Sequence, residues 1–275
     1  MMIMAINLQF LAQPLESLKT KLLYHYFNFR INGIADPYRV RLRQKPYKII
    51  FILSHMRSGS SLFSHILNSN PEIIGYGETH INYQSEADLK ALQFKVYWQL
   101  KNPQMCHTYI LDKILHDHKI VNTDILRSPH IYTIFLIREP QKTLASILDI
   151  KPDWSEEKAV KYYCDRLETL GDYAKIIGDT RSYFFLTYDQ LINGSEQVFL
   201  DLQKFLKTAS GFSEEYQILK TTGKRGIGDS TEKIKAGRIV KSERKLDITI
   251  SPEASARAMQ IFTKCQDQLS AKSNV

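Results

Sequence analysis

The stretch from Lys48 to Leu67 has the residue types and the order of a phosphate-binding loop. Its apolar run KIIFIL (48–53) breaks into the polar loop SHMRSGSS (54–61), and apolar residues then return at helical spacing in LFSHIL (62–67). A strand, a tight turn and a helix N-terminus together offer an anion unpaired backbone N–H groups and a partial positive charge. Gly59 lets the backbone approach closely, and the loop adds one charge and three hydroxyls: Arg57, Ser58, Ser60 and Ser61.

The loop departs from the nucleotide P-loop pattern GxxxxGK[ST]. Gly59 keeps the second glycine, whereas Ser54 replaces the first and Ser60 stands at the lysine position. That lysine reaches the β- and γ-phosphates of a nucleotide triphosphate, so a γ-phosphate would lack its main positive partner here. The residues therefore favour a terminal phosphate or sulfate ester. A nucleotide or small-molecule kinase with a degenerate P-loop, dependent on ATP and Mg²⁺, is the second interpretation.

The same loop resembles the 5′-phosphosulfate loop of sulfotransferases, which use 3′-phosphoadenosine-5′-phosphosulfate (PAPS). The segment MRSGSSLFSHILNSNPEIIGYGETH (56–80) is most similar to the opening of the tyrosylprotein branch and its bacterial relatives. The resemblance also takes in residues 108–150 and 182–206, and more weakly 221–240. It implies an enzyme that moves a sulfuryl group from PAPS to a hydroxyl acceptor, releases adenosine 3′,5′-bisphosphate and uses no metal.

The resemblance assigns several residues to the cofactor. In this family an arginine at the end of a central strand and a serine eight residues later hold the 3′-phosphate, and IREPQKTLAS (137–146) supplies Arg138 and Ser146. Arg57 would lie at the opposite, phosphosulfate end of the nucleotide. Tyr188, in LTYDQL, would lie near the adenosine. The loop expected to close over the cofactor would contribute Arg225, Ser230 and Lys235.

The resemblance further implies a general base and cations at the leaving phosphate. The tyrosylprotein branch places a glutamate base shortly after its second strand, and Glu78 in GYGETH lies at the matching offset from Arg57. His80 is the rival base, because the ordinary pKa of histidine suits proton transfer at neutral pH. Lys113 precedes Arg138 by the spacing of the family's active-site lysine. Lys113 and Arg57 are therefore expected to stabilise the leaving phosphate.

The acceptor is not specified by any pattern in the chain. A peptide, a glycan, a lipid and a small metabolite all remain open as hydroxyl acceptors. The tyrosylprotein enzymes carry an arginine where His80 stands, so their acceptor preference is not carried over. A non-catalytic nucleotide-binding protein on the same fold is a third interpretation, and such a protein would be indifferent to mutation of Glu78.

Short apolar strands that alternate with helices predict the elements that must position these residues. Such alternation is typical of a parallel sheet covered on both faces, here an α/β, P-loop-like three-layer domain. The expected strands are 48–53, 72–77, 108–115, 130–138 and 182–189. The expected helices are 60–68, most of 81–107, one that begins in 142–149, 155–178, 195–206 and one capped by Ser251. We expect one domain over 1–275, with an N-terminal helical extension (1–45) and a cofactor-closing loop (221–245).

Composition narrows the remaining classes. Three scattered cysteines without a CxxC pair are typical of reduced residues in a cytoplasmic protein and predict no metal site. The net charge of +8 suits an anionic ligand, nucleic acid or a membrane surface. No nucleic-acid-binding signature is present, so no such partner is expected.

The apolar opening is too short to span a bilayer. We expect it to start a helix that packs on the domain, with peripheral membrane contact as the alternative.

Overall fold

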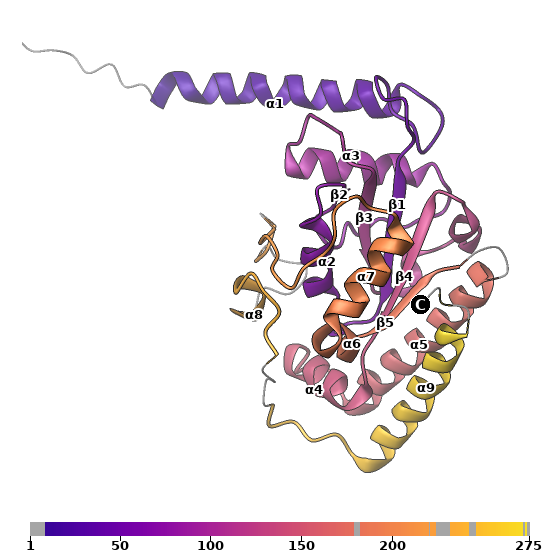
Figure 1. Ribbon diagram of the computed structural model, residues 1–275. Helices are drawn as coiled ribbons and strands as arrows, with labels where there is room; N and C mark the ends of the chain where they lie inside the picture. Colours follow the sequence, from indigo (N-terminus) through magenta and orange to yellow (C-terminus); the bar gives the residue numbers. More distant parts are fainter. Residues whose placement is uncertain are drawn as a thin grey trace, which may run out of the picture.

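The fold is built on a central parallel sheet. The structure, a computed structural model, describes residues 9–178, 182–219, 221–223, 232–241, 246–271 and 273. Five strands pair in the order β2-β3-β1-β4-β5, and every pairing is parallel (Figure 1). The strands are β1 (Lys48–Ser54), β2 (Ile73–Ile74), β3 (Tyr109–Ile114), β4 (Ile131–Ile137) and β5 (Phe184–Thr187). The predicted α/β class and parallel sheet are confirmed.

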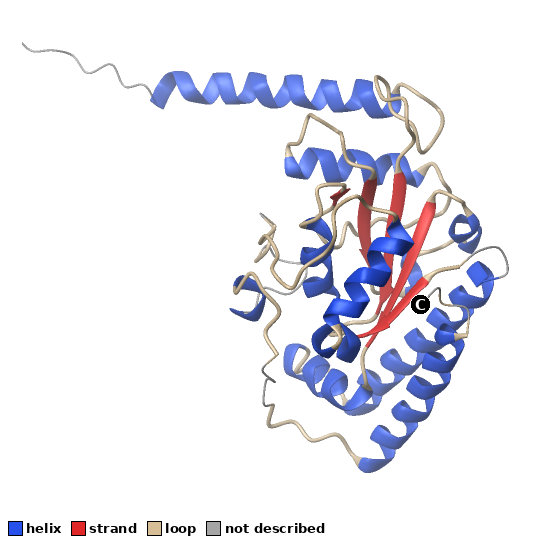
Figure 2. Cartoon of the chain, in the orientation of Figure 1, coloured by secondary structure: helices blue, strands red, loops and turns tan. Residues whose placement is uncertain are grey.

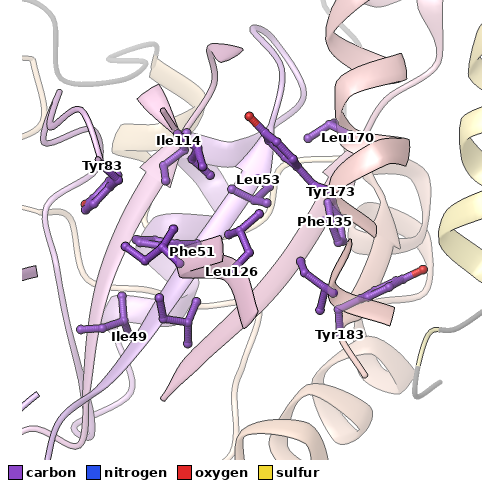
Figure 3. Close-up of a cluster of buried hydrophobic side chains, with 14 of the residues drawn as sticks. Ile49, Phe51, Leu53, Tyr83, Ile114, Leu126, Phe135, Leu170, Tyr173 and Tyr183 are labelled. Carbon is purple, nitrogen blue, oxygen red and sulfur yellow. The ribbon is translucent and has the colours of Figure 1, made fainter. Parts of the chain in front are cut away.

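Strand β1 lies at the centre because its run of apolar residues buries both faces. Successive side chains point to opposite faces of a sheet. Ile49, Phe51 and Leu53 enter one buried cluster, part of which Figure 3 shows, whereas Ile50 and Ile52 enter another. All five side chains have no exposed surface. The loop 54–61 therefore continues directly from a rigid, buried strand.

Helices cover both faces of the sheet (Figure 2). One face carries α2 (Ser60–Asn68), α6 (Tyr188–Asn193) and α7 (Ser195–Leu206). The other carries α3 (Asp88–Leu100), α4 (Pro140–Ile150), α5 (Glu156–Gly178) and α9 (Pro252–Ser270). The long N-terminal helix α1 (Gln9–Asn32) packs on α3. No helix in the described part of the chain is both long and apolar enough to cross a membrane.

Most expected elements are confirmed, and four differ. The expected strand 182–189 ends at Thr187, which caps α6, so Tyr188 begins a helix. The second strand is only two residues long, and directly after it Gly75 lies so close to β3 that a Cβ would be 2.6 Å from the Leu111 carbonyl oxygen. Helix α3 begins at Asp88, whose carboxylate accepts hydrogen bonds from two preceding backbone N–H groups. Helix α4 begins at Pro140, because Glu139 caps it and its side chain accepts from the N–H groups of the first turn.

Candidate active site

The carboxyl ends of all five strands deliver a side chain to one cavity of 1460 Å³. Arg57 follows β1, Glu78 follows β2, and Lys113 is the next-to-last residue of β3. Arg138 is the first residue after β4, and Tyr188 is the first after β5. Ligands of open α/β sheets bind at this edge of the sheet. Residues far apart in sequence therefore meet because the strands are parallel.

The loop after β1 places the N-terminus of α2 in the cavity wall. Gly59 is the residue before α2 and has φ 91°, a conformation that favours glycine. A Cβ at this position would also overlap the ring of Tyr188. Ser60 and Ser61, the first two residues of α2, line the cavity. Backbone N–H groups at a helix start suit an anion, so the predicted binding loop has the required shape.

Ser58, in contrast, supports the loop from within. It is fully buried, and its Oγ lies 2.6 Å from Ser54 Oγ. It also accepts a hydrogen bond of 3.3 Å from the backbone N–H of Ser60. Ser58 is not among the residues that line the cavity in the described part of the chain. Its hydroxyl therefore shapes the turn.

Two guanidinium groups and a hydroxyl converge beside this loop. Arg57 Nε donates to Ser146 Oγ at 2.8 Å, across 89 residues of sequence. Arg138 Nη1 donates to the carbonyl oxygen of Arg57 at 3.2 Å, and its guanidinium lies 4.3 Å from the centre of the Tyr188 ring. Arg57 and Arg138 thus line one cavity. The serine expected to serve the 3′-phosphate is bonded to Arg57, which links the two expected ends of the nucleotide site.

Lys113 joins the expected base to the loop after β1. Its Nζ lies 3.2 Å from Glu78 Oε1 and donates to Ser61 Oγ, also at 3.2 Å. The Lys113 side chain is 2% exposed and that of Glu78 is 14% exposed. A buried ammonium needs such a carboxylate partner. His80 Nδ1 is 4.0 Å from Glu78 Oε2, and its side chain is 48% exposed. Glu78 is therefore the more enclosed of the two candidate bases.

Asp112, the neighbour of Lys113 on β3, holds the segment that follows Glu78. Its carboxylate accepts from the backbone N–H of Thr79 at 2.9 Å, from Thr79 Oγ1 at 2.6 Å and from the Tyr83 hydroxyl at 2.6 Å. Complete burial raises the pKa of Asp112 above its ordinary value. Adjacent residues of a strand point to opposite faces of the sheet. Asp112 therefore holds the segment after Glu78 from one face, while Lys113 lines the cavity on the other.

His55 is a positioning residue that sequence reasoning missed. Its Nε2 accepts from the backbone N–H of Arg138 at 3.0 Å, and its Nδ1 lies 2.9 Å from the Met56 carbonyl oxygen. Burial lowers its pKa to about 3, so the imidazole is neutral and can accept at one nitrogen and donate at the other. A histidine inside the polar loop was the available signal. It connects the end of β1 to the end of β4.

Arg166, on α5, connects the ends of two strands and carried no signal in the sequence. Its Nε donates to the carbonyl oxygen of Ser54 at 2.8 Å, and Nη2 donates to that of Ile114 at 2.9 Å. Asp117 balances its charge, with Nη1 to Oδ1 at 2.6 Å. The side chain is fully buried. Two of its three contacts thus tie the last residue of β1 to the last residue of β3.

The expected closing loop is described only in part. Arg225 and Ser230 lie outside the described residues. Lys235, at the end of α8 (Glu232–Lys235), is paired with Glu232 at 2.7 Å and does not line the cavity. Arg238 and Lys241 do line it, and sequence reasoning missed both although they belong to the same basic stretch.

Comparison with solved structures finds related folds. The sulfotransferase domain from the curacin biosynthetic pathway aligns with a TM-score of 0.51 and 15% identity, over 80% of this chain and 99% of that one. The sulfotransferase domain from the Synechococcus PCC 7002 olefin synthase aligns with a TM-score of 0.51 and 15% identity, over 81% and 96%. No family model and no curated protein matches the sequence. The chain therefore has the fold of sulfotransferase domains.

Proposed function

We propose that this chain is a PAPS-dependent sulfotransferase that forms a sulfate ester on a hydroxyl acceptor. The observation that carries the proposal is the bridge that Lys113 makes between Glu78 and Ser61 of the anion-binding loop. A carboxylate, an ammonium and the first turn of α2 are thus joined by two contacts, and such groups could serve as base and as charge stabiliser in a group transfer. The fold shared with two sulfotransferase domains supports the same chemistry.

The cavity residues suit a nucleotide with two anionic ends. The N-terminus of α2, with Ser60 and Ser61, would hold the 5′-phosphosulfate. Arg138 and Ser146 would hold the 3′-phosphate, since a guanidinium fork and a hydroxyl make charge-assisted bonds to phosphate oxygens. Tyr188 would lie beside the adenosine. The volume of 1460 Å³ exceeds the ~300–1000 Å³ of ordinary ligand pockets, so an acceptor has room in the same cavity.

Three residues would act on the reacting groups. Bound PAPS would supply a sulfuryl group, whose bond to the 5′-phosphate breaks as the acceptor oxygen attacks sulfur. Glu78 would take the proton from the acceptor hydroxyl. Lys113 and Arg57 would stabilise the charge that develops on the leaving phosphate. Adenosine 3′,5′-bisphosphate would be the second product.

A thermal-shift comparison of two ligands tests this proposal. We expect adenosine 3′,5′-bisphosphate, at ~100 times its dissociation constant, to stabilise the full chain by about 2.7 kcal/mol. ATP with Mg²⁺ should stabilise it far less, because Ser60 stands where a kinase loop has lysine. Arg138→Ala should reduce the shift strongly, whereas Arg127→Ala, at an exposed arginine outside the cavity, should preserve it. A larger shift with ATP and Mg²⁺ would instead support a kinase.

A further inference from the structure

Helix α1 carries an apolar stripe on the side opposite its packing face. Leu18, Leu22 and Phe29 are spaced four and seven residues apart, so they lie on one face of the helix. They are 56%, 61% and 50% exposed. Phe27 points the other way, is fully buried and lies 6.3 Å, between ring centres, from Tyr97 of α3. We call the three exposed residues the outer stripe.

A basic turn continues this surface beyond the end of α1. Leu42 is 82% exposed and has φ 60°, and it lies between Arg41 and Arg43. The Arg41 guanidinium lies 4.6 Å from the centre of the Phe29 ring, and the Arg41 backbone N–H bonds to the last turns of α1 at 2.8 Å. The turn (residues 39–45) is thus attached to the outer stripe. An exposed leucine between two arginines marks its tip.

Almost all of the chain's excess positive charge lies in this region. Residues 18–48 hold eight Lys and Arg against one acid, so they carry +7 of the net charge of +8 and leave +1 for the rest of the chain. Lys19 and Lys21 are exposed and flank the outer stripe on either side. Apolar groups and cations therefore share one surface.

We propose that the outer stripe and the basic turn form a docking surface for an anionic lipid bilayer. The leucines and Phe29 would enter the boundary between headgroups and acyl chains, while flanking lysines and arginines meet the headgroup phosphates. A second copy of the chain is a poorer occupant, because a two-fold contact would place +7 against +7. Nucleic acid is also poorer, because the stripe would face a charged backbone.

The docking surface and the cavity lie at opposite ends of the sheet. Figure 1 shows α1 across the end at which β1 begins, with α4 near the other end. The cavity is lined by residues at the carboxyl ends of the strands and by α4. A bilayer bound by α1 would therefore leave the cavity mouth directed away from the lipid. This proposal stands independently of the proposed function.

Vesicle co-sedimentation of the full chain tests the surface. The probes are vesicles of phosphatidylcholine alone and vesicles of phosphatidylcholine and phosphatidylserine in equal parts. We expect binding to the mixed vesicles that falls as salt rises, because exposed charges are screened. The double variant Leu22→Asp/Leu42→Asp should lower the partition coefficient at least ~tenfold. Leu200→Asp, at a leucine of α7 that is 50% exposed, should leave it unchanged.

The charge requirement has its own matched pair of variants. Lys19→Glu/Lys21→Glu should lower partitioning at least ~tenfold, whereas Lys161→Glu/Lys264→Glu, at exposed lysines elsewhere, alters the net charge equally and should leave it unchanged. Melting curves of all variants verify folding, and Leu22→Ser/Leu42→Ser provides a milder second set. Equal binding to both vesicle types, no binding to either, or a stable dimer that Leu22→Asp dissociates would each overturn the proposal.

Discussion

Glu78 and Lys113 depend on each other in the cavity floor. Their charged atoms lie 3.2 Å apart, and the Lys113 side chain is almost fully buried. Removing either partner would leave the other charge uncompensated in a poorly hydrated place. Glutamine at position 78 also removes the charge, but its amide oxygen can still accept a hydrogen bond from Lys113, so it disturbs this contact less than alanine does.

Glu78→Gln should remove the base and keep the side-chain shape. We expect turnover to fall by ~10²–10⁴, while the thermal shift with adenosine 3′,5′-bisphosphate is retained. Transfer of labelled sulfuryl from PAPS to a panel of hydroxyl acceptors measures turnover. His80→Gln should cost only a few-fold. If the two variants exchange these effects, His80 is the base, and if neither matters, the chain binds the nucleotide without catalysis.

Arg138 can be tested with a pair of ligands that differ in one group. Adenosine 3′,5′-bisphosphate has the 3′-phosphate and adenosine 5′-monophosphate lacks it. If Arg138 holds that phosphate, Arg138→Ala should weaken binding of the bisphosphate by about 1.5–3 kcal/mol, the range for hydrogen bonds to charged groups. Binding of the monophosphate should change little. Calorimetric titration measures both affinities. Equal weakening of the two would place Arg138 elsewhere on the nucleotide.

At the scale of elements, the turn after β1 packs directly against the start of α6. Gly59 takes a left-handed conformation, and the Tyr188 ring fills the space that a side chain at Gly59 would need. The ring also lies over the Arg138 guanidinium. Turns that follow three different strands therefore share one contact, which keeps the cavity wall in a single arrangement.

Gly59→Ala should strain the turn and push its new methyl group against the Tyr188 ring. Both the positive φ and the overlap with Tyr188 oppose a Cβ, so we expect a loss of about 1–3 kcal/mol in the free energy of unfolding. The double variant Gly59→Ala/Tyr188→Ala should recover part of that loss, because the overlap is removed and the backbone strain remains. Urea denaturation measures the cycle. Strictly additive effects would show that the two residues do not interact.

At the scale of the whole molecule, buried histidines couple stability to pH. Burial lowers the pKa of four imidazoles below 6.5: His55, His65, His107 and His116. These imidazoles therefore take up protons less readily in the folded chain than in the unfolded chain. The unfolded state therefore binds more protons below pH 6.5, and stability falls as the pH is lowered from there.

His55 should contribute the steepest part of this acid sensitivity. Its pKa of about 3 predicts a loss approaching 1.4 kcal/mol per pH unit between pH 6.5 and that value. Urea midpoints at pH 7 and pH 5 measure the loss. His55→Asn, which does not titrate there, should flatten the dependence by about one proton. An unchanged slope in the variant would mean that His55 is already protonated in the folded chain.

The sequence by itself determined the features that local chemistry encodes. The apolar run of β1, the glycine of its turn and the serine cap of α9 each act within a few residues, so the strand, the loop and the helix start could be predicted. The resemblance of the loop to that of sulfotransferases predicted the fold that this chain shares with the solved sulfotransferase domains.

Only the tertiary structure decided which side chains meet. The bond between Arg57 and Ser146, the pair of Glu78 with Lys113 and the three contacts of Arg166 all join segments that are far apart in the sequence. The order of the strands in the sheet sets these contacts, because it brings together strand ends that are far apart in the sequence. The close approach of Gly75 to Leu111 of β3 is likewise a contact between segments 36 residues apart. Local sequence selects the elements, and packing of the sheet selects the site.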